Sequence, residues 1–199
     1  MHGMINRAIQ CFLRDTYGAQ TWSDIVDEAG LGLDNFEAML GYPDTVTLDV
    51  LAATARHFRK PVESLLEDLG TYLVSHPNVE AIRRLLRFGG ESFAEFLFSL
   101  NELQGRARLA LPDLELPRMT VKPDGDGVFE LTCSHAMPGF GYAMLGVLRA
   151  MADDYGALVF LEHQGWKDSG DEVIKVHLLE AAFSEGRAFN LVETEGATA

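Results

Sequence analysis

Three side chains that can bind a metal ion recur at every second position in the string TCSHAM: Cys133, His135 and Met137. If this string is a β-strand, the three point to the same side, because successive side chains of a strand alternate between its faces. A thiolate, an imidazole and a thioether suit transition metals. Their Cα atoms would lie about 6.6 Å apart at each step, so one metal bound by all three would require a bulge. His135 is the member best suited to bind iron alone.

Gln104, near the end of an apolar helical stretch and ahead of Pro112 and Pro117, is the second chemical candidate. Its amide oxygen is a weak donor to iron, whereas a neutral imidazole offers a directed lone pair. A glutamine in a ligand position would therefore weaken metal binding. Taken without its neighbours, the residue is equally consistent with a partly exposed helical position.

The composition argues against several classes of function. The 199 residues carry 16 Lys and Arg against 30 Asp and Glu, a net charge of −14, so nucleic acid and anionic membranes are not expected as partners. Cys11 and Cys133 lack CxxC spacing, and no apolar run approaches a membrane span of roughly 20 residues. We expect a cytoplasmic protein with an intact N-terminus. No nucleophile motif, phosphate-binding glycine loop or pair of carboxylates indicates an enzyme.

The elements that must position these residues begin with helices. Apolar residues at helical spacing predict that the first hundred residues are helical throughout. Within them we expect a capping box at Thr21, a short helix at DNFEAML and an N-cap at Thr47. A long helical stretch, interrupted at Gly89-Gly90, follows from about residue 79 to residue 111.

The pattern changes after Pro112. Two short strands around PDGDG predict a hairpin, GYAMLGVLRAMADDYG predicts an amphipathic helix, and ALVFLEHQGWKDSGDEVIKVHLLE predicts a second hairpin that turns near KDSGD. We therefore predict an α+β fold in a single domain over residues 1–190. Its helical N-terminal lobe would span residues 1–75, and a lobe with the long helix, an antiparallel sheet and an inserted helix would span 76–190. A flexible tail is expected at 191–199.

Other polar side chains are expected to face solvent. Arg83, Arg84 and Arg87 are spaced to form one basic cluster on a helix, and the default for such a cluster is a solvated face, with docking of a partner as the alternative. His163 lies in a boundary segment and is likewise expected to be hydrated. These residues are therefore not assigned to the site.

Several strings occur in an order and spacing that match one known family. MHGMINRAIQCFLRDTYG resembles its opening helix, and Trp22 with AGL at residues 29–31 continues the match. SFAEFLFSLNELQGRARLALPDLELPRM resembles its heme-ligating helix and exit, and MPGFGYAMLGVLRAMADDYG resembles the segment after its propionate motif. Over nearly its full length the chain is similar to the heme-nitric oxide/oxygen-binding (H-NOX) domains of bacterial gas sensors and soluble guanylate cyclases.

The resemblance implies a heme b between the two lobes, with a helix histidine as proximal ligand and a Tyr-x-Ser-x-Arg strand that holds the propionates. Gas binding at the distal face would shift the lobes and regulate a histidine kinase, a diguanylate cyclase or a guanylate cyclase. In this register Gln104 stands at the proximal histidine, and Cys133, His135 and Met137 stand at the Tyr, Ser and Arg positions. Tyr142 matches a distal tyrosine that donates to bound oxygen. The matching apolar pocket positions are Ile5, Ile9, Pro117 and Leu145.

Two functions follow from these substitutions. The first is a sensor that binds heme without the family's usual ligands, with His135 as a relocated iron ligand, or another apolar ligand, and regulates a separate effector. It predicts a preserved cavity between the lobes. The alternative is a heme-free interaction protein that keeps the fold and the partner surface. It predicts that a large side chain such as Phe93, Phe96 or Phe140 fills the space.

Overall fold

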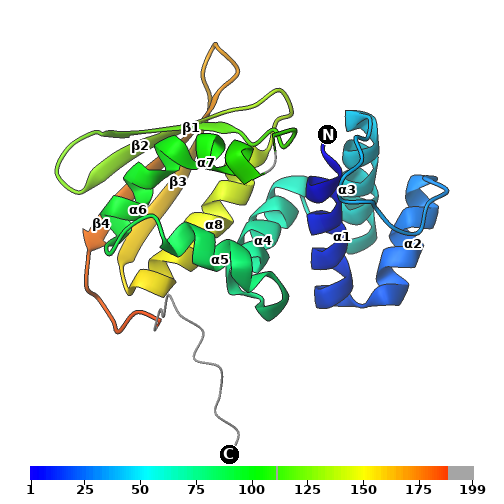
Figure 1. Ribbon diagram of the computed structural model, residues 1–199, viewed down its shortest axis with the longest axis horizontal. Helices are drawn as coiled ribbons and strands as arrows, with labels where there is room; N and C mark the ends of the chain where they lie inside the picture. The colour runs from blue at the N-terminus through cyan, green and yellow to red at the C-terminus, as the bar shows by residue number, and fades with distance from the viewer. Residues whose placement is uncertain (111, 188–199) are drawn as a thin grey trace, which may run out of the picture.

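Four helices carry the first 75 residues: α1 (Gly3–Tyr17), α2 (Ala19–Ala29), α3 (Asp44–Phe58) and α4 (Val62–Ser75). α1 to α3 lie on the right of Figure 1, and α4 leads from them to the rest of the molecule. The computed structural model describes residues 1–110 and 112–187, so residues 188–190 of the predicted domain and the predicted tail at 191–199 lie outside the described residues. The N-terminal core is built from side chains of all four helices, including Ile9, Phe12, Leu13, Trp22, Ile25, Val50, Leu51, Leu66 and Leu69.

α2 begins earlier than the capping box at Thr21 predicts. The helix starts at Ala19, because Gly18 adopts a φ of 93° that turns the chain directly from α1 into α2. The Thr21 hydroxyl therefore lies within the first turn and donates to the Tyr17 carbonyl at 2.9 Å instead of capping the helix.

The segment between α2 and α3 is held by side chains of α1. The helix predicted at DNFEAML is not formed: Phe36 is 1% exposed in the core, and its N–H donates to Gln10 Oε1 at 2.9 Å. Thr47 is not an N-cap, since α3 starts at Asp44; its hydroxyl is buried and donates to Asn6 Oδ1 at 2.6 Å. The side-chain amides of Gln10 and Asn6, both on α1, thus accept from the Phe36 N–H and the Thr47 hydroxyl. These long-range hydrogen bonds take the place of the local helix and the N-cap that the sequence predicts.

Short helices connect α4 to the sheet: η1 (Pro77–Val79), α5 (Glu80–Arg87), α6 (Phe93–Ser99), η2 (Leu100–Glu102) and α7 (Leu103–Ala110). The break between α5 and α6 falls at Gly89-Gly90, as the sequence predicts. α6 then starts with a capping box in which the side chains of Ser92 and Glu95 accept from each other's backbone N–H. A second break, at η2, brings α7 against β1 (Arg118–Pro123).

The basic cluster on α5 is not the solvated face that the sequence predicts. Arg83 is 4% exposed, and its guanidinium donates to Asp154 Oδ1 at 2.7 Å. Arg87 Nε lies 3.3 Å from Asp154 Oδ2, and its guanidinium carbon lies 3.7 Å from the ring centroid of Tyr155. A buried carboxylate at the end of α8 (Phe140–Tyr155) therefore determines where α5 docks.

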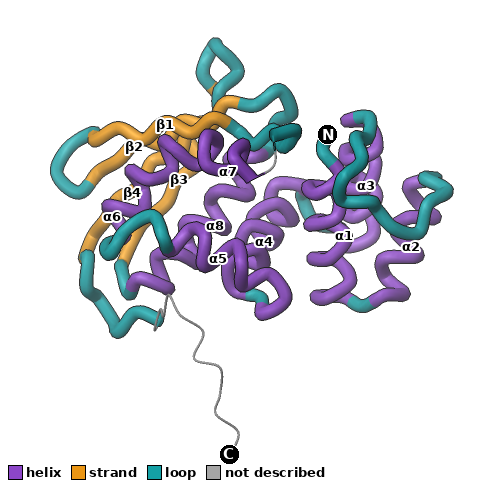
Figure 2. Tube along the Cα trace, in the orientation of Figure 1, coloured by secondary structure: helices purple, strands orange, loops and turns teal. Residues whose placement is uncertain are grey.

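The sheet has the order β1-β2-β4-β3, with every neighbouring pair antiparallel. Its other strands are β2 (Val128–Ser134), β3 (Leu158–Trp166) and β4 (Glu172–Glu180), and the two hairpins are those predicted at PDGDG and KDSGD. α8 packs against β3 and β4, while α6 to α7 pack against β1 (Figure 2). The second core lies between these helices and the sheet and includes Leu97, Leu100, Met119, Leu131, Leu148, Met151 and Ile174. The predicted α+β class is confirmed.

α4 and α8 join the two lobes and pack backbone to backbone. A Cβ added at Gly70 on α4 would overlap the carbonyl of Ala143, and one added at Gly146 on α8 would overlap the carbonyl oxygen of Glu67. The two helix axes can approach this closely because neither glycine has a side chain. Tyr142, on the same helix as Gly146, packs against both cores.

Tyr72 of α4 donates a 2.6 Å hydrogen bond to Asp15 Oδ2 and thereby holds the pKa of that carboxyl below its usual 3.8. Tyr72→Phe is expected to reduce stability by up to about 1 kcal/mol at neutral pH. Because the pKa of Asp15 is lower in the folded chain, this stabilisation is present above the unfolded pKa and is lost as the pH falls through the folded pKa. Urea unfolding at neutral and strongly acidic pH measures it; an equal difference at both would contradict this assignment.

Candidate functional site

Gln104 lies in α7 and is half-buried. Its Nε2 donates to the carbonyl of Leu116 at 2.9 Å, across the segment that leads from α7 to β1. The amide therefore links two parts of the chain. A side chain held in this way offers a ligand only its carbonyl oxygen, which is a weak donor for iron.

Cys133, His135 and Met137 do not share one strand face. β2 ends at Ser134, so only Cys133 lies on the strand, and His135 and Met137 lie in the turn that leads to α8. The Met137 N–H closes this turn by donating to His135 Nδ1 at 3.0 Å. Cys133 is 2% exposed and Met137 is 6% exposed. The alternation that the sequence suggests therefore stops one residue before His135.

His135 is half-buried, with its ring centroid 4.4 Å from that of Phe140. When Nδ1 accepts from Met137, a neutral ring carries its proton on Nε2; with the proton on Nδ1, the ring can donate to the Met137 carbonyl at 3.3 Å. Nε2 has no hydrogen-bond partner within the described part of the chain. The ring also lines two adjoining cavities of about 420 and 440 Å³. Only the tautomer with the proton on Nδ1 leaves a lone pair on Nε2 for a metal ion.

Burial raises the pKa of the Cys133 thiol to about 12, and the nearby Glu172 carboxylate adds to the shift. The reactive thiolate is then negligible near neutral pH. We expect a thiol reagent such as DTNB to modify the native protein at half-buried Cys11 alone and to reach Cys133 only after unfolding. Thiol counts on wild type and Cys11→Ser, with and without urea, measure this. Fast labelling of native Cys11→Ser would contradict it.

A buried carboxylate that the sequence analysis missed connects β4, β3 and α8. Glu172 is 3% exposed; its Oε1 accepts from the Gly139 N–H at 2.8 Å, and its Oε2 lies 3.1 Å from His163 Nε2. His163 Nδ1 accepts from the Gly165 N–H at 3.1 Å. The expectation that His163 is hydrated is therefore wrong, because both ring nitrogens bind within the protein. The sequence does place this histidine and this glutamate on the two strands of one predicted hairpin, and that placement could have indicated their contact.

Tyr142 stacks on His163, with ring centroids 4.1 Å apart and planes at 6°. The ring of Trp166 lies edge-on to it at 6.4 Å. Burial, with smaller effects of Glu63 and Glu172, raises the pKa of the Tyr142 hydroxyl, which therefore stays protonated and can donate a hydrogen bond. The aromatic contacts hold the ring in place without a bound ligand.

The predicted apolar pocket residues divide between the two cores. Ile9, 3% exposed, lies in the N-terminal core with Ile5 at its edge, and Leu145, 6% exposed, lies in the core beneath the sheet. Pro117 is buried just before β1. A side chain on the wall of a porphyrin-sized void would lack neighbouring protein atoms on that side. Ile9 and Leu145 are instead almost wholly enclosed by protein atoms.

The three phenylalanines of the heme-free hypothesis occupy different places. Phe93 and Phe96 pack on each other and on Tyr155, near the C-terminal end of α8. Phe140 contacts a predicted site residue, His135. Phe140 thus adjoins the predicted site, while Phe93 and Phe96 belong to the core that also contains Cys133 and Leu145.

The residues at the ligand positions do not fit a heme b held by a proximal histidine. Gln104 binds the backbone at Leu116, and Met137 is an enclosed, uncharged thioether at the position where an arginine would pair with a propionate. A buried propionate without a cation costs several kcal/mol. The apolar frame is kept, while the polar contacts to the cofactor are replaced.

A helical lobe joined through α4 and α8 to a helix-covered antiparallel sheet is the H-NOX fold. The chain is similar to an H-NOX protein from K. algicida, with a TM-score of 0.78 at 16% identity over 93% of this chain and 100% of that one. An H-NOX variant from S. oneidensis gives a TM-score of 0.77 at 13% identity, covering 95% and 100% of the two chains. The predicted fold is therefore confirmed.

The Haem-NO-binding family (HNOB) matches residues 2–163, and the chain belongs to this family of heme-based gas sensors. It is 23% identical over 154 residues to soluble guanylate cyclase gcy-31 of Caenorhabditis elegans, covering 77% of this chain and 22% of the cyclase. It is 23% identical over 159 residues to soluble guanylate cyclase 89Db of Drosophila melanogaster, covering 79% and 24%. The chain thus spans less than a quarter of the length of these two relatives.

Two absences concern residues 1–110 and 112–187. None of the helices in these ranges is both long and apolar enough to cross a membrane. These ranges also contain no group of three or more His, Cys, Asp or Glu side chains that could hold a metal ion.

Proposed function

We propose that this chain is a signalling domain of the H-NOX type that works without histidine-ligated heme and regulates an effector such as a histidine kinase or diguanylate cyclase. The hydrogen bond from Gln104 Nε2 to the Leu116 carbonyl carries the proposal. It uses the residue at the ligand position to hold α7 to the segment before β1. In such a chain the ligand position serves an internal hydrogen bond while the fold is kept. We therefore take partner binding to be the function that the chain retains.

The contact between α4 and α8 supports this role. Packed interfaces shift between discrete arrangements rather than deforming continuously. Because Gly70 and Gly146 bring the two backbones together, movement of one lobe is carried to the other at this contact. The site of action would be the cytoplasm, and the net charge of −14 disfavours nucleic acid or an anionic membrane as the partner.

A second candidate is a sensor that binds heme through His135. One observation favours it: the ring is half-buried beside two cavities, and when Nδ1–H donates to the Met137 carbonyl, Nε2 has a lone pair and no hydrogen-bond partner within residues 1–110 and 112–187. A bound imidazole at this position would serve as the axial ligand that Gln104 cannot replace.

Absorption spectra of protein expressed with excess heme separate the two candidates. We expect no stoichiometric Soret band in wild type or in Gln104→His, because Met137 brings no charge to the position where an arginine would pair with a propionate. His135→Ala is compared with His57→Ala, a change at an exposed histidine on α3. A wild-type Soret band that is lost in His135→Ala but kept in His57→Ala would establish the second candidate. A band kept in both variants would also overturn the heme-free proposal.

A further inference from the structure

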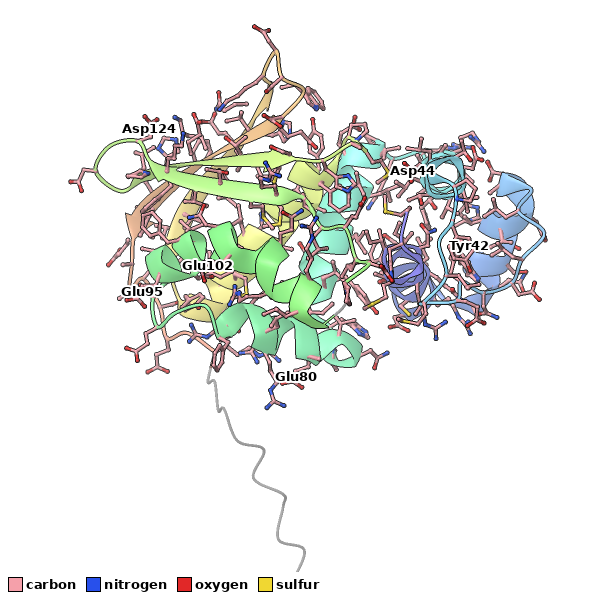
Figure 3. All side chains as sticks on the ribbon, turned by 45° about the horizontal axis from the view of Figure 1, so that its top comes forward. Tyr42, Asp44, Glu80, Glu95, Glu102 and Asp124 are labelled. Carbon is pink, nitrogen blue, oxygen red and sulfur yellow. The ribbon has the colours of Figure 1, made fainter. Side chains whose placement is uncertain are left out.

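Two adjoining cavities beside His135, together called the groove, reach from one lobe to the other. They share Glu115, His135 and Ala136 as a common wall. The cavity of about 420 Å³ extends to the N-terminal lobe, where Met39 and Asp44 line it. Figure 3 labels Asp44 on the edge of that lobe that faces the sheet. The cavity of about 440 Å³ extends to Gln104 and the first residue of β1. An occupant of the whole groove would therefore touch both lobes.

Opposite charges line the two ends of this groove. Arg108 and Arg118 lie at the end next to Gln104, and Asp113 lies at the other end, with Glu115 between. All four side chains are exposed, and none forms an ion pair with another residue of the ranges 1–110 and 112–187. The four lie within eleven positions of one another in the sequence but do not neutralise each other.

Two further carboxylates in the groove already have partners. Asp44 Oδ1 accepts from the amino group of Met1 at 2.6 Å. Asp171, at the basic end, accepts from Ser134 and, at 2.7 Å, from Ser169, and these hydrogen bonds, with smaller effects of Lys167 and Arg118, lower the pKa of its carboxyl. The charges that face an occupant are therefore the two guanidinium groups beside the Asp171 carboxylate at one end and the carboxylates of Asp113 and Glu115 at the other.

We infer that this groove binds an extended peptide segment of the effector, with an acidic side chain at Arg108 and Arg118 and a basic side chain at Asp113 and Glu115. This inference rests on the proposed function, because it assigns the surface through which the effector is recognised. A protein of net charge −14 repels acidic groups over most of its surface, so two arginines in one groove give an acidic side chain a specific place. An occupant that spans both lobes would fix their relative position.

Peptides of the form acetyl-Glu-(Ala)n-Lys-amide, with one, three or five alanines, test the assignment by titration into isotopically labelled protein. We expect the best-fitting length to shift the amide signals of groove residues. The double variant Arg108→Glu/Arg118→Glu should weaken its binding at least about tenfold, since like charges then face each other. Lys122→Glu is the matched control: it reverses an exposed charge on the same strand as Arg118, outside the groove, and should leave binding unchanged.

Further measurements with these peptides and variants either support the inference or overturn it. A peptide with Lys at both ends should bind the double variant more tightly than wild type, which loss of folding could not produce. If acetyl-Glu-amide binds wild type as tightly as the peptides, the groove is a small-anion site and the inference is wrong. Equal weakening by Lys122→Glu, or no shifts at any length, would also overturn it. None of these outcomes depends on heme, so the absorption spectra decide the proposed function separately.

Discussion

Replacing Asp154 by alanine is expected to lower the free energy of unfolding by about 3–5 kcal/mol. Asp154 is 4% exposed and faces two arginines of α5: its Oδ1 accepts from Arg83 at 2.7 Å, and its Oδ2 lies 3.3 Å from Arg87 Nε. Removing the carboxylate leaves the almost fully buried guanidinium of Arg83 without this counter-ion. Glu80, another carboxylate near Arg83, is 58% exposed at 3.8 Å and compensates little.

Urea unfolding of Asp154→Ala beside a surface pair gives the matched comparison. Arg56 Nε and Glu28 Oε1 are also 2.7 Å apart, but their side chains are 59% and 36% exposed. Glu28→Ala is therefore expected to cost less than about 1 kcal/mol. Asp154→Asn, which keeps an acceptor but removes the charge, should fall between the two. Similar losses for Asp154→Ala and Glu28→Ala would show that the α5 contact is not a buried ion pair in solution.

The hairpins of the sheet could be predicted from neighbouring residues, whereas several predictions about the helices were wrong because the residues involved bind partners far away in the sequence. PDGDG and KDSGD contain their own turn residues, so the hairpins could be placed without knowledge of the rest of the chain. Thr47 looked like an N-cap by its own type, but its hydroxyl binds Asn6, 41 positions earlier. Arg83 likewise looked like a surface residue because Asp154 lies 71 positions away. Neither partner can be identified from the residues that surround Thr47 or Arg83 in the sequence.

The sequence predicted which residues belong to the candidate site, but not which atoms those residues contact. The family register singled out Gln104, but its hydrogen bond to Leu116 depends on how the chain turns between α7 and β1. The stripe from Cys133 to Met137 assumed that β2 continues through it. The strand instead ends at Ser134, where the chain turns toward α8 through Gly139 with a φ of 102°. Glu172 was missed because its partners come from two other elements.

Gly146→Ala is expected to destabilise the protein by about 3 kcal/mol or more. The added methyl group would overlap the Glu67 carbonyl oxygen and approach the Thr71 nitrogen to 2.7 Å, and both are backbone atoms of α4 that no side-chain rotation can move. The two helices would have to separate along the contact that joins the lobes. Thermal or urea unfolding measures the loss, and amide signals of α4 should report the displacement.

Gly105→Ala is the matched control, because Gly105 also lies inside a helix, α7, and an added Cβ there meets nothing within 4 Å. It is expected to stabilise the protein by about 0.5–1 kcal/mol, since alanine restricts the unfolded chain more than glycine does. Both substitutions change the unfolded state in the same way, so their difference isolates the α4–α8 contact. A difference below about 1 kcal/mol would mean that the helices separate easily. The lobes would then be loosely coupled, and this contact could not carry a signal between them.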